Sequence, residues 1–195
     1  MVVWFATGNV HKRGELAAML PEADIRIPSD AGLEFDPDEN GETFLENALI
    51  KARALYGLVN APVIADDSGL CVDALGGRPG TRSARYGTRD GYVISAEKRN
   101  RLLLRELGQA ENRRARFVCA MVLMLAKDRF FAAQETLEGE ILQEPRGLGG
   151  FGFDPIVCLP EHGMTVAELP AETKNALSHR GKAAAAIKTF LARLP

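Results

Sequence analysis

The sequence lacks the features that mark membrane-spanning and nucleic-acid-binding proteins. Its 195 residues contain no uninterrupted apolar run of the roughly 20 residues that a membrane-spanning helix needs. Its 24 basic and 26 acidic residues give a formal net charge of −2, whereas a nucleic-acid-binding surface requires a clear excess of positive charge. We therefore expect neither a membrane nor a nucleic acid as a partner.

Cysteine is also scarce. Cys71, Cys119 and Cys158 are far apart, form no Cys-x-x-Cys pair and are odd in number. This argues against a zinc site of that type and against a disulfide framework, and it favours a reducing, cytoplasmic location. Residues 1–6 are apolar without a preceding basic segment and are followed at once by Thr7-Gly8-Asn9. We expect a first strand there, not a signal peptide.

The composition and the order of patterns predict an α/β protein. Hydrophobic residues make up 46% of the chain, and 195 residues suffice for one domain with a large core. Strand-type and helix-type segments alternate at first, and strand-type segments then follow one another, so we predict a mixed central sheet flanked by helices. The expected strands cover 1–6, 24–27, 62–65, 116–126, 130–133 and 138–142, and the expected helices begin near residues 13, 43, 95 and 182.

Two adjacent carboxylates follow the apolar segment 62–65. Asp66 and Asp67 are succeeded by Ser68 and Gly69, at the point where we expect the strand to end. Carboxylate oxygens at a strand end are suitable ligands for a hard cation such as Mg²⁺. The same residue types also form ordinary turns, so the pair alone leaves an acidic turn open.

The turn after the first strand is a candidate phosphate site. It consists of Thr7, Gly8, Asn9, Val10, His11 and Lys12. Main-chain N–H groups at a helix start attract anions, and Lys12 adds a positive charge. Alternatively, Thr7 or Asn9 simply caps the helix, since this is not the longer Walker-type loop.

An acidic segment, 34–42, precedes the helix that begins at Thr43. Most of its carboxylates are expected on a solvated face, although one of them could reach a metal. Thr43 and Glu46 have the spacing of a capping box. Glu46 therefore has a structural explanation that competes with a role near a cation.

Two further segments suit the base of a nucleotide. Four glycines in 147–152 leave room for a close ligand, Phe151 and Phe153 offer flat faces, and Asp154 is an acceptor. The alternative is a glycine-rich hairpin with two core aromatics. Donor groups gather near the start of the last helix, at Lys174, His179 and Arg180. Each of these three also fits a surface position.

These segments occur together in a fixed order. They are Thr7-Gly8-Asn9-x-x-Lys12, Phe44-x-Glu46-Asn47-Ala48, Ala65-Asp66-Asp67-Ser68-Gly69-Leu70, Leu75-Gly76-Gly77-x-Pro79-Gly80, Gly150-Phe151-Gly152-Phe153-Asp154-Pro155 and Ser178-His179-Arg180. With them the sequence resembles, nearly end to end, the noncanonical purine nucleoside triphosphate pyrophosphatases, the inosine triphosphatase or Ham1-like family. The resemblance implies a single domain over 1–195 that is elongated, with two lobes around an active-site cleft, and a homodimer. It also implies Mg²⁺-dependent hydrolysis of ITP, dITP and XTP to the monophosphate and pyrophosphate.

The resemblance also implies roles for single residues. Asp67 would be the catalytic carboxylate and a metal ligand, and Ser68 would touch the substrate. Asp38 is the best match for a second acidic metal ligand, with a neighbouring acid or Glu46 as alternatives. Thr7 to Lys12 would hold the phosphates, and the nucleoside would be enclosed by Phe151, Gly152, Phe153, Asp154, Lys174, His179 and Arg180. Phe153 stands where the family often has Tyr or Trp.

The chemistry of these groups suggests a reaction. Asp67 would accept a proton from a water that attacks the α-phosphorus, and Asp66 would support Asp67 without touching substrate. Donors from Lys174, His179 or Arg180 would pair with the 6-oxygen of hypoxanthine or xanthine and face an amino group in adenine. Two other functions stay open: a pyrophosphatase for pyrimidine or modified dNTPs, and a nucleotide-binding module without turnover.

Overall fold

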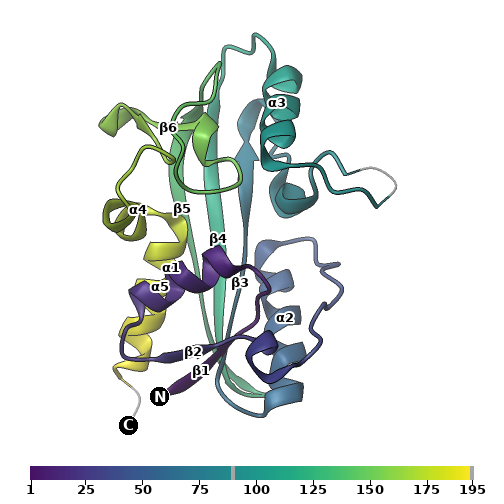
Figure 1. Cartoon of the computed structure of the whole chain (residues 1–195), viewed down its shortest axis with the longest axis vertical. Helices are drawn as coiled ribbons and strands as arrows, with labels where there is room; N and C mark the ends of the chain where they lie inside the picture. Colours follow the sequence, from purple (N-terminus) through teal and green to yellow (C-terminus); the bar gives the residue numbers. More distant parts are fainter. Residues whose placement is uncertain (89–90, 194–195) are drawn as a thin grey trace. The chain divides into compact units, whose positions relative to one another are not determined.

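The structure, a computed structural model, describes residues 1–88 and 91–193 (Figure 1). The described strands form a seven-stranded sheet in the order β2-β1-β3-β4-β5-β6-β7. The strands are β1 (Val2–Phe5), β2 (Asp24–Arg26), β3 (Val63–Val72), β4 (Arg114–Ala126), β5 (Arg129–Ile141), β6 (Val157–Leu159) and β7 (Met164–Thr165). β1 is parallel to β2 and β3, whereas β6 is antiparallel to β5 and β7. The predicted mixed sheet is confirmed.

Apart from α4, which the sequence did not predict, the described helices begin at capped positions close to those expected from the sequence. They are α1 (Val10–Met19), α2 (Phe44–Val59), α3 (Ala96–Leu107), α4 (Ala171–Leu177) and α5 (His179–Leu191). The capping box of α2 is confirmed, because Thr43 Oγ1 accepts from Glu46 N at 3.2 Å and Glu46 Oε2 accepts from Thr43 N at 3.0 Å. In the described ranges, no helix is long and apolar enough to cross a membrane.

The chain divides into two compact units. Unit 1 consists of Met1–Ser68, Cys119–Glu135 and Asn175–Pro195, and unit 2 consists of Gly69–Val118 and Thr136–Lys174. Each unit has buried apolar residues of its own, and the core of unit 2 gathers side chains from β3, β4, β5, β6 and α3. The single domain over 1–195 and the cleft between two lobes stay predictions.

Alternate residues of the strands in unit 1 pack against different helices. Cys119, Met121 and Leu123 of β4 share a core with residues of α1 and α5, which lie side by side in Figure 1. Ala120 and Val122, which lie between them in sequence, share a second core with residues of α2. This is the two-residue period of a strand that is covered on both faces.

The same alternation corrects the prediction for the carboxylate pair. β3 does not end at Ala65 but continues to Val72, so Asp66 and Asp67 lie within the strand. The strand continues because residues beyond the pair are buried in unit 2, where Leu70 N donates to Ser83 Oγ at 2.8 Å. Adjacent strand residues point to opposite faces. The two carboxylates therefore do not converge on one cation, as a strand end had suggested.

A second correction concerns 130–142. The two strands predicted at 130–133 and 138–142 are a single strand, β5. The polar residues between them favoured an interruption, but the side chain of Gln134 is exposed and needs no buried partner. A strand whose face is partly open to solvent accepts such residues without breaking.

Candidate functional site

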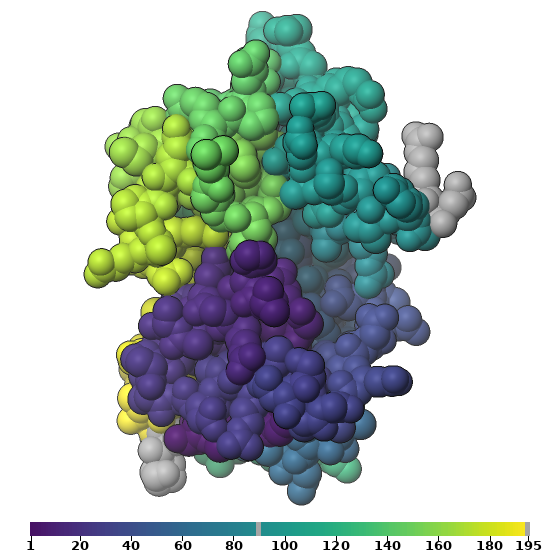
Figure 2. Space-filling model, viewed as in Figure 1, coloured from purple at the N-terminus to yellow at the C-terminus, as the bar shows by residue number. Residues whose placement is uncertain are grey.

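The turn from β1 into α1 is closed by side-chain hydrogen bonds. Asn9 is the N-cap of α1, and its Oδ1 accepts from His11 N at 2.9 Å and Lys12 N at 3.3 Å. Thr7 Oγ1 accepts from Asn9 N at 3.0 Å. Asn9 therefore caps the helix, which is the alternative that the sequence left open for this turn. Gly8, Val10 and His11 are exposed, and the start of the chain is open to solvent in Figure 2. An anion can therefore reach this turn and accept hydrogen bonds from its main-chain N–H groups, which it would share with Asn9.

Asp66 is enclosed by positive charge on the side of β3 that faces α1 and α5. Lys12 Nζ lies 3.0 Å from its carboxylate, and Nε and Nη2 of Arg180 each lie 3.2 Å from Oδ2. Burial alone would raise the pKa of Asp66, but Lys12, Arg180 and Lys51 lower it far below its usual range. Asp66 is thus a buried anion that holds Lys12 at the start of α1.

Arg180 is paired rather than open to a ligand. Its side chain is 2% exposed, and besides Asp66 it donates to Glu15 and, at 2.9 Å, to Ser68 Oγ. A buried guanidinium must be matched by acceptors, which explains this arrangement. Arg180 and Ser68 are both held in the network around Asp66, and their expected roles toward the nucleoside and the substrate stay predictions.

The charge of Asp66 predicts a particular acid sensitivity. Because its folded-state pKa lies below the ordinary value of 3.8, its ion pairs stabilise the fold above that pH and are lost as the pH falls below it. The free energy of unfolding, measured with urea from neutral pH downward, should fall steeply in this window. Asp66→Asn should flatten that fall, while the exposed Asp36→Asn should retain it. Equal slopes in both variants would contradict this account.

Asp67 faces the opposite side, toward α2. Asn47 Nδ2 donates to its Oδ2 at 3.0 Å, Ser68 N donates to its Oδ1 at 3.0 Å, and Lys51 Nζ lies 3.7 Å from Oδ1. Burial raises the pKa of Asp67, and Lys51 and Asn47 oppose this effect without cancelling it. A carboxylate with raised proton affinity suits a group that takes a proton from water.

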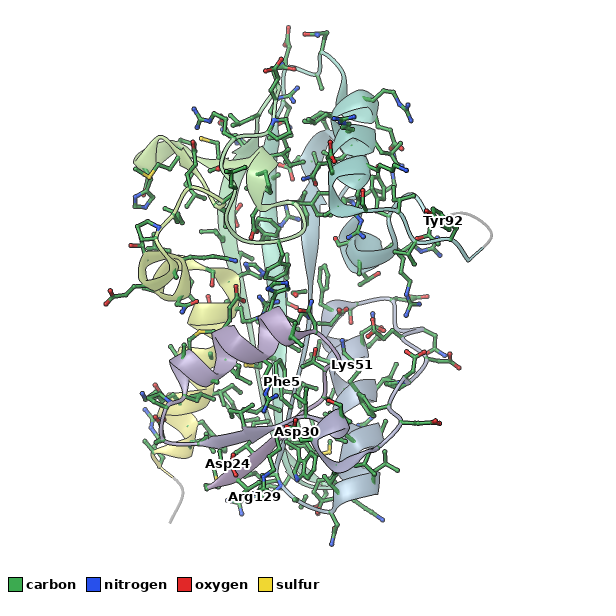
Figure 3. All side chains as sticks on the ribbon, viewed as in Figure 1. Phe5, Asp24, Asp30, Lys51, Tyr92 and Arg129 are labelled. Carbon is green, nitrogen blue, oxygen red and sulfur yellow. The ribbon has the colours of Figure 1, made fainter. Side chains whose placement is uncertain are left out.

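Lys51 joins Asp67 to the acidic segment 34–42. This lysine of α2, labelled in Figure 3, lies 3.1 Å from Glu39 Oε1 as well as 3.7 Å from Asp67. Its side chain is only 8% exposed. Burial lowers the pKa of Lys51, but the charges of Asp66, Asp67 and Glu39 outweigh this and raise it. A positive charge is therefore favoured between the carboxylates of Glu39 and Asp67.

This arrangement favours the neighbouring acid Glu39, which the sequence left open as an alternative to Asp38 for the second metal ligand. Asp38 is exposed, and its side chain has no partner among the described residues, whereas the next residue, Glu39, is turned inward to Lys51. Glu46 is occupied as a cap, since its Oε2 also accepts from Glu42 N at 2.7 Å. Over the ranges 1–88 and 91–193, no three His, Cys, Asp or Glu side chains form a metal cluster.

In unit 2, Phe151, Asp154 and Lys174 form a fixed group. Asp154 Oδ2 accepts from Phe151 N at 2.8 Å and from Lys174 Nζ at 3.0 Å, and that ammonium lies 4.6 Å from the centroid of the Phe151 ring. Gly150 has φ +69°, and a side chain there would collide with the Asp154 carboxylate. Gly152 also has a positive φ, of 65°. Asp154 thus orients Lys174 and is not a free acceptor.

Phe153 belongs to the core of unit 2. It is 4% exposed, packs with Leu70 and Ile156 among others, and makes an edge contact with Tyr86 at a centroid distance of 6.4 Å. Phe153 is therefore a core aromatic, the alternative that the sequence left open, and its role in stacking on a base stays a prediction. Phe151 is half-buried and keeps its interaction with Lys174.

Substitution of the two phenylalanines should separate these roles. Phe153→Ala should lower the free energy of unfolding by about 3–5 kcal/mol, the usual cost of truncating a core aromatic. Phe151→Ala should cost less stability but raise the KM for a nucleotide, because it removes an accessible ring. Urea unfolding and steady-state kinetics of both variants test this. A stability loss confined to Phe151→Ala would contradict the assignment.

Sequence reasoning named His179 in unit 1 but missed Asn47 and Lys51. His179 was named, and it is the first residue of α5, buried, next to the N-cap Ser178, whose Oγ accepts from Gly181 N at 3.0 Å. Asn47 and Lys51 were not assigned, although they are four residues apart on the face of α2 that also carries the buried Leu55. Polar residues on a buried helical face were the signal that could have found them.

Comparison with known proteins identifies the family of this chain. Residues 3–190 match the model of the Ham1 family. The chain belongs to the Ham1 family. A dITP/XTP pyrophosphatase of Treponema denticola is 52% identical over 98% of both chains, and one of Geobacillus kaustophilus is 46% identical over 91% of this chain and 88% of that one. Among solved structures, a HAM1 protein from Coxiella burnetii has a TM-score of 0.90 with 36% identity over 100% of both chains.

A second solved Ham1 structure agrees with the first. The Ham1 protein of Staphylococcus aureus has a TM-score of 0.88 and 36% identity, covering 98% of both chains. The expected relationship to Ham1-like proteins is therefore confirmed, and so is the mixed α/β fold.

Proposed function

We propose that this Ham1 family chain hydrolyses noncanonical purine nucleoside triphosphates, namely dITP, ITP and XTP, to the monophosphate and pyrophosphate. Its relatives in Treponema denticola and Geobacillus kaustophilus are dITP/XTP pyrophosphatases. The observation that carries the proposal is the buried carboxylate of Asp67, held by Asn47 and flanked by Lys51 and Glu39. A module that only binds nucleotides would have no use for such a buried and charged arrangement, which costs desolvation.

The proposed cofactor is Mg²⁺, with Asp67 and Glu39 as the residues that would hold it. The ammonium of Lys51 already lies between these two carboxylates, which is support from the structure that a cation is favoured at this place. Two carboxylates are few ligands, but Mg²⁺ in proteins commonly takes one or two carboxylates and completes its shell with water and substrate phosphates. When bound, the ion would neutralise and polarise phosphoryl oxygens.

The residues of the chain have distinct proposed tasks around the phosphates. Asp67 accepts the proton of the water that attacks the α-phosphorus, in line with its raised pKa. Lys12, together with N–H groups at the start of α1, neutralises charge on the leaving pyrophosphate. Asp66 keeps Lys12 in place through their 3.0 Å ion pair, and Asp66 is itself held by Arg180.

In unit 2, Phe151 and Lys174 are the proposed base-binding residues. The ring of Phe151 offers a surface for a flat base, and the ammonium of Lys174, fixed by Asp154, is a donor suited to the 6-oxygen of hypoxanthine or xanthine. Adenine presents an amino donor at that position, and a site built for an acceptor rejects it because a buried donor is left unpaired.

The proposal extends to the oligomeric state and the location of the protein. A homodimer in the cytoplasm is implied by the resemblance to the inosine triphosphatases. Cys71, Cys119 and Cys158 are all free thiols, which agrees with a reducing location. Sedimentation equilibrium of the purified chain would give twice the mass of 21.2 kDa if the dimer forms.

A panel of nucleotides tests the proposed function. The chain is incubated with dITP, XTP, dATP, dGTP, dCTP and modified dNTPs, with Mg²⁺ and with a chelator, and released pyrophosphate is measured. We expect release from dITP and XTP that requires the metal. Preference for a pyrimidine or modified dNTP would favour another pyrophosphatase, and release from none of them would favour a binding module.

A further inference from the structure

The side chain of Asn47 donates one hydrogen bond and accepts another. It lies in α2 with 2% exposure. Its Nδ2 donates to Asp67 Oδ2 at 3.0 Å, and its Oδ1 accepts from Gly41 N at 2.8 Å. A main-chain N–H can only donate and a carboxylate can only accept, so the amide fits in one orientation. The side chain therefore forms a bridge between β3 and the acidic segment 34–42.

The contact at Gly41 is close enough to fix the backbone of this segment. A Cβ added at Gly41 would lie 2.7 Å from Glu46 Cβ and 2.8 Å from Asn47 Oδ1. The neighbouring N–H groups, of Glu42 and Thr43, are bonded to Glu46. The segment 34–42 thus packs against the first turn of α2. Glu39 lies two residues before Gly41, whose N–H is bonded to Asn47.

We propose that Asn47 is a positioning residue, which sets the place of the Asp67 carboxylate relative to the segment that carries Glu39. The inference rests on the proposed function, because only there do Asp67 and Glu39 act together. Lys51 pairs with both carboxylates, but a flexible ammonium at 3.1 and 3.7 Å imposes little direction on either. The amide of Asn47 supplies the direction, since its two ends bond to defined atoms.

The stability of α2 does not account for Asn47. The helix start already has a complete capping box of Thr43 and Glu46. Its buried face is supplied by Ala48, Ala52 and Leu55, which are fully buried. What Asn47 adds beyond these contacts is the pair of hydrogen bonds to Asp67 and Gly41, which an apolar residue would leave without this partner.

Two substitutions separate the two bonds. Asn47→Asp keeps an acceptor for Gly41 N but removes the donor to Asp67, whereas Asn47→Ala removes both. We expect kcat with dITP and Mg²⁺ to fall about 10²-fold in each, the cost of a reacting group displaced by about 1 Å, with KM changing far less. Exchange of the Gly41 amide hydrogen, followed by NMR, should accelerate in Asn47→Ala and stay slow in Asn47→Asp.

The control is Asn100→Ala. Asn100 is a buried asparagine of α3, 4% exposed, and it has no part in the site. It should keep wild-type kcat and KM, and thermal unfolding of all variants shows that each is folded at the assay temperature. Wild-type kcat in folded Asn47→Asp and Asn47→Ala would overturn the inference, as would a rise in KM alone. If wild-type protein releases no pyrophosphate, the proposed function itself fails instead.

Discussion

Replacing Asp67 with asparagine should lower kcat for dITP by at least about 10²-fold while the protein stays folded. The loss is the usual contribution of a general base, and an amide cannot accept the proton of the attacking water. Asparagine has almost the same shape, so the contacts with Ser68 N and Lys51 are disturbed less than by truncation. Steady-state kinetics at saturating Mg²⁺ measures the effect, because excess metal offsets weaker binding of the ion.

The matched control for this substitution is Asp36→Asn. Asp36 is an exposed carboxylate of the acidic segment 34–42, so the same chemical change occurs outside the proposed site. Its kcat and KM should equal those of the wild type. If folded Asp67→Asn turned over dITP at a near-normal rate, Asp67 would not be the essential group, and the role of base would have to pass to another residue.

Replacing Arg180 with methionine should lower the free energy of unfolding by about 3–5 kcal/mol, since it removes one partner from a buried ion pair. Asp66 has no side-chain exposure, and among the described residues it would keep Lys12 as its direct cationic partner. Glu15 would lose its ion pair with Arg180 as well. Urea unfolding at neutral pH measures the loss.

The double variant Asp66→Asn with Arg180→Met distinguishes the ion pair from simple loss of packing. If the cost comes from an unpaired buried charge, the double variant is less destabilised than the sum of the two single variants. Additive losses would show that Asp66 and Arg180 contribute independently. A cost for Arg180→Met alone within about 1 kcal/mol, as for an exposed pair, would contradict the assignment.

The local features of the fold could be predicted because their causes are local. The pattern Thr43-x-x-Glu46 predicts a capping box, and both of its hydrogen bonds form. The length of β3 could not be predicted in this way. Its continuation through Asp66 and Asp67 depends on Lys12, Arg180 and Asn47, which satisfy two buried carboxylates from distant parts of the sequence.

The same reason explains which alternatives for the site residues the sequence left open. Asp38 and Glu39 are adjacent acids, and only the position of Lys51 decides which of them turns inward. Phe151 and Phe153 are equally aromatic, but Phe153 fills the core of unit 2. The motifs in the sequence predict which segments form the site. The direction of each side chain depends on contacts between those segments, which the sequence alone does not show.

The most direct test of the proposed reaction follows the oxygen of water. The chain is incubated with dITP and Mg²⁺ in ¹⁸O-labelled water, and the products are separated and analysed by ³¹P NMR and mass spectrometry. Attack on the α-phosphorus predicts dIMP that carries the label and pyrophosphate that does not. Release of orthophosphate with dIDP, or label in the pyrophosphate, would contradict it.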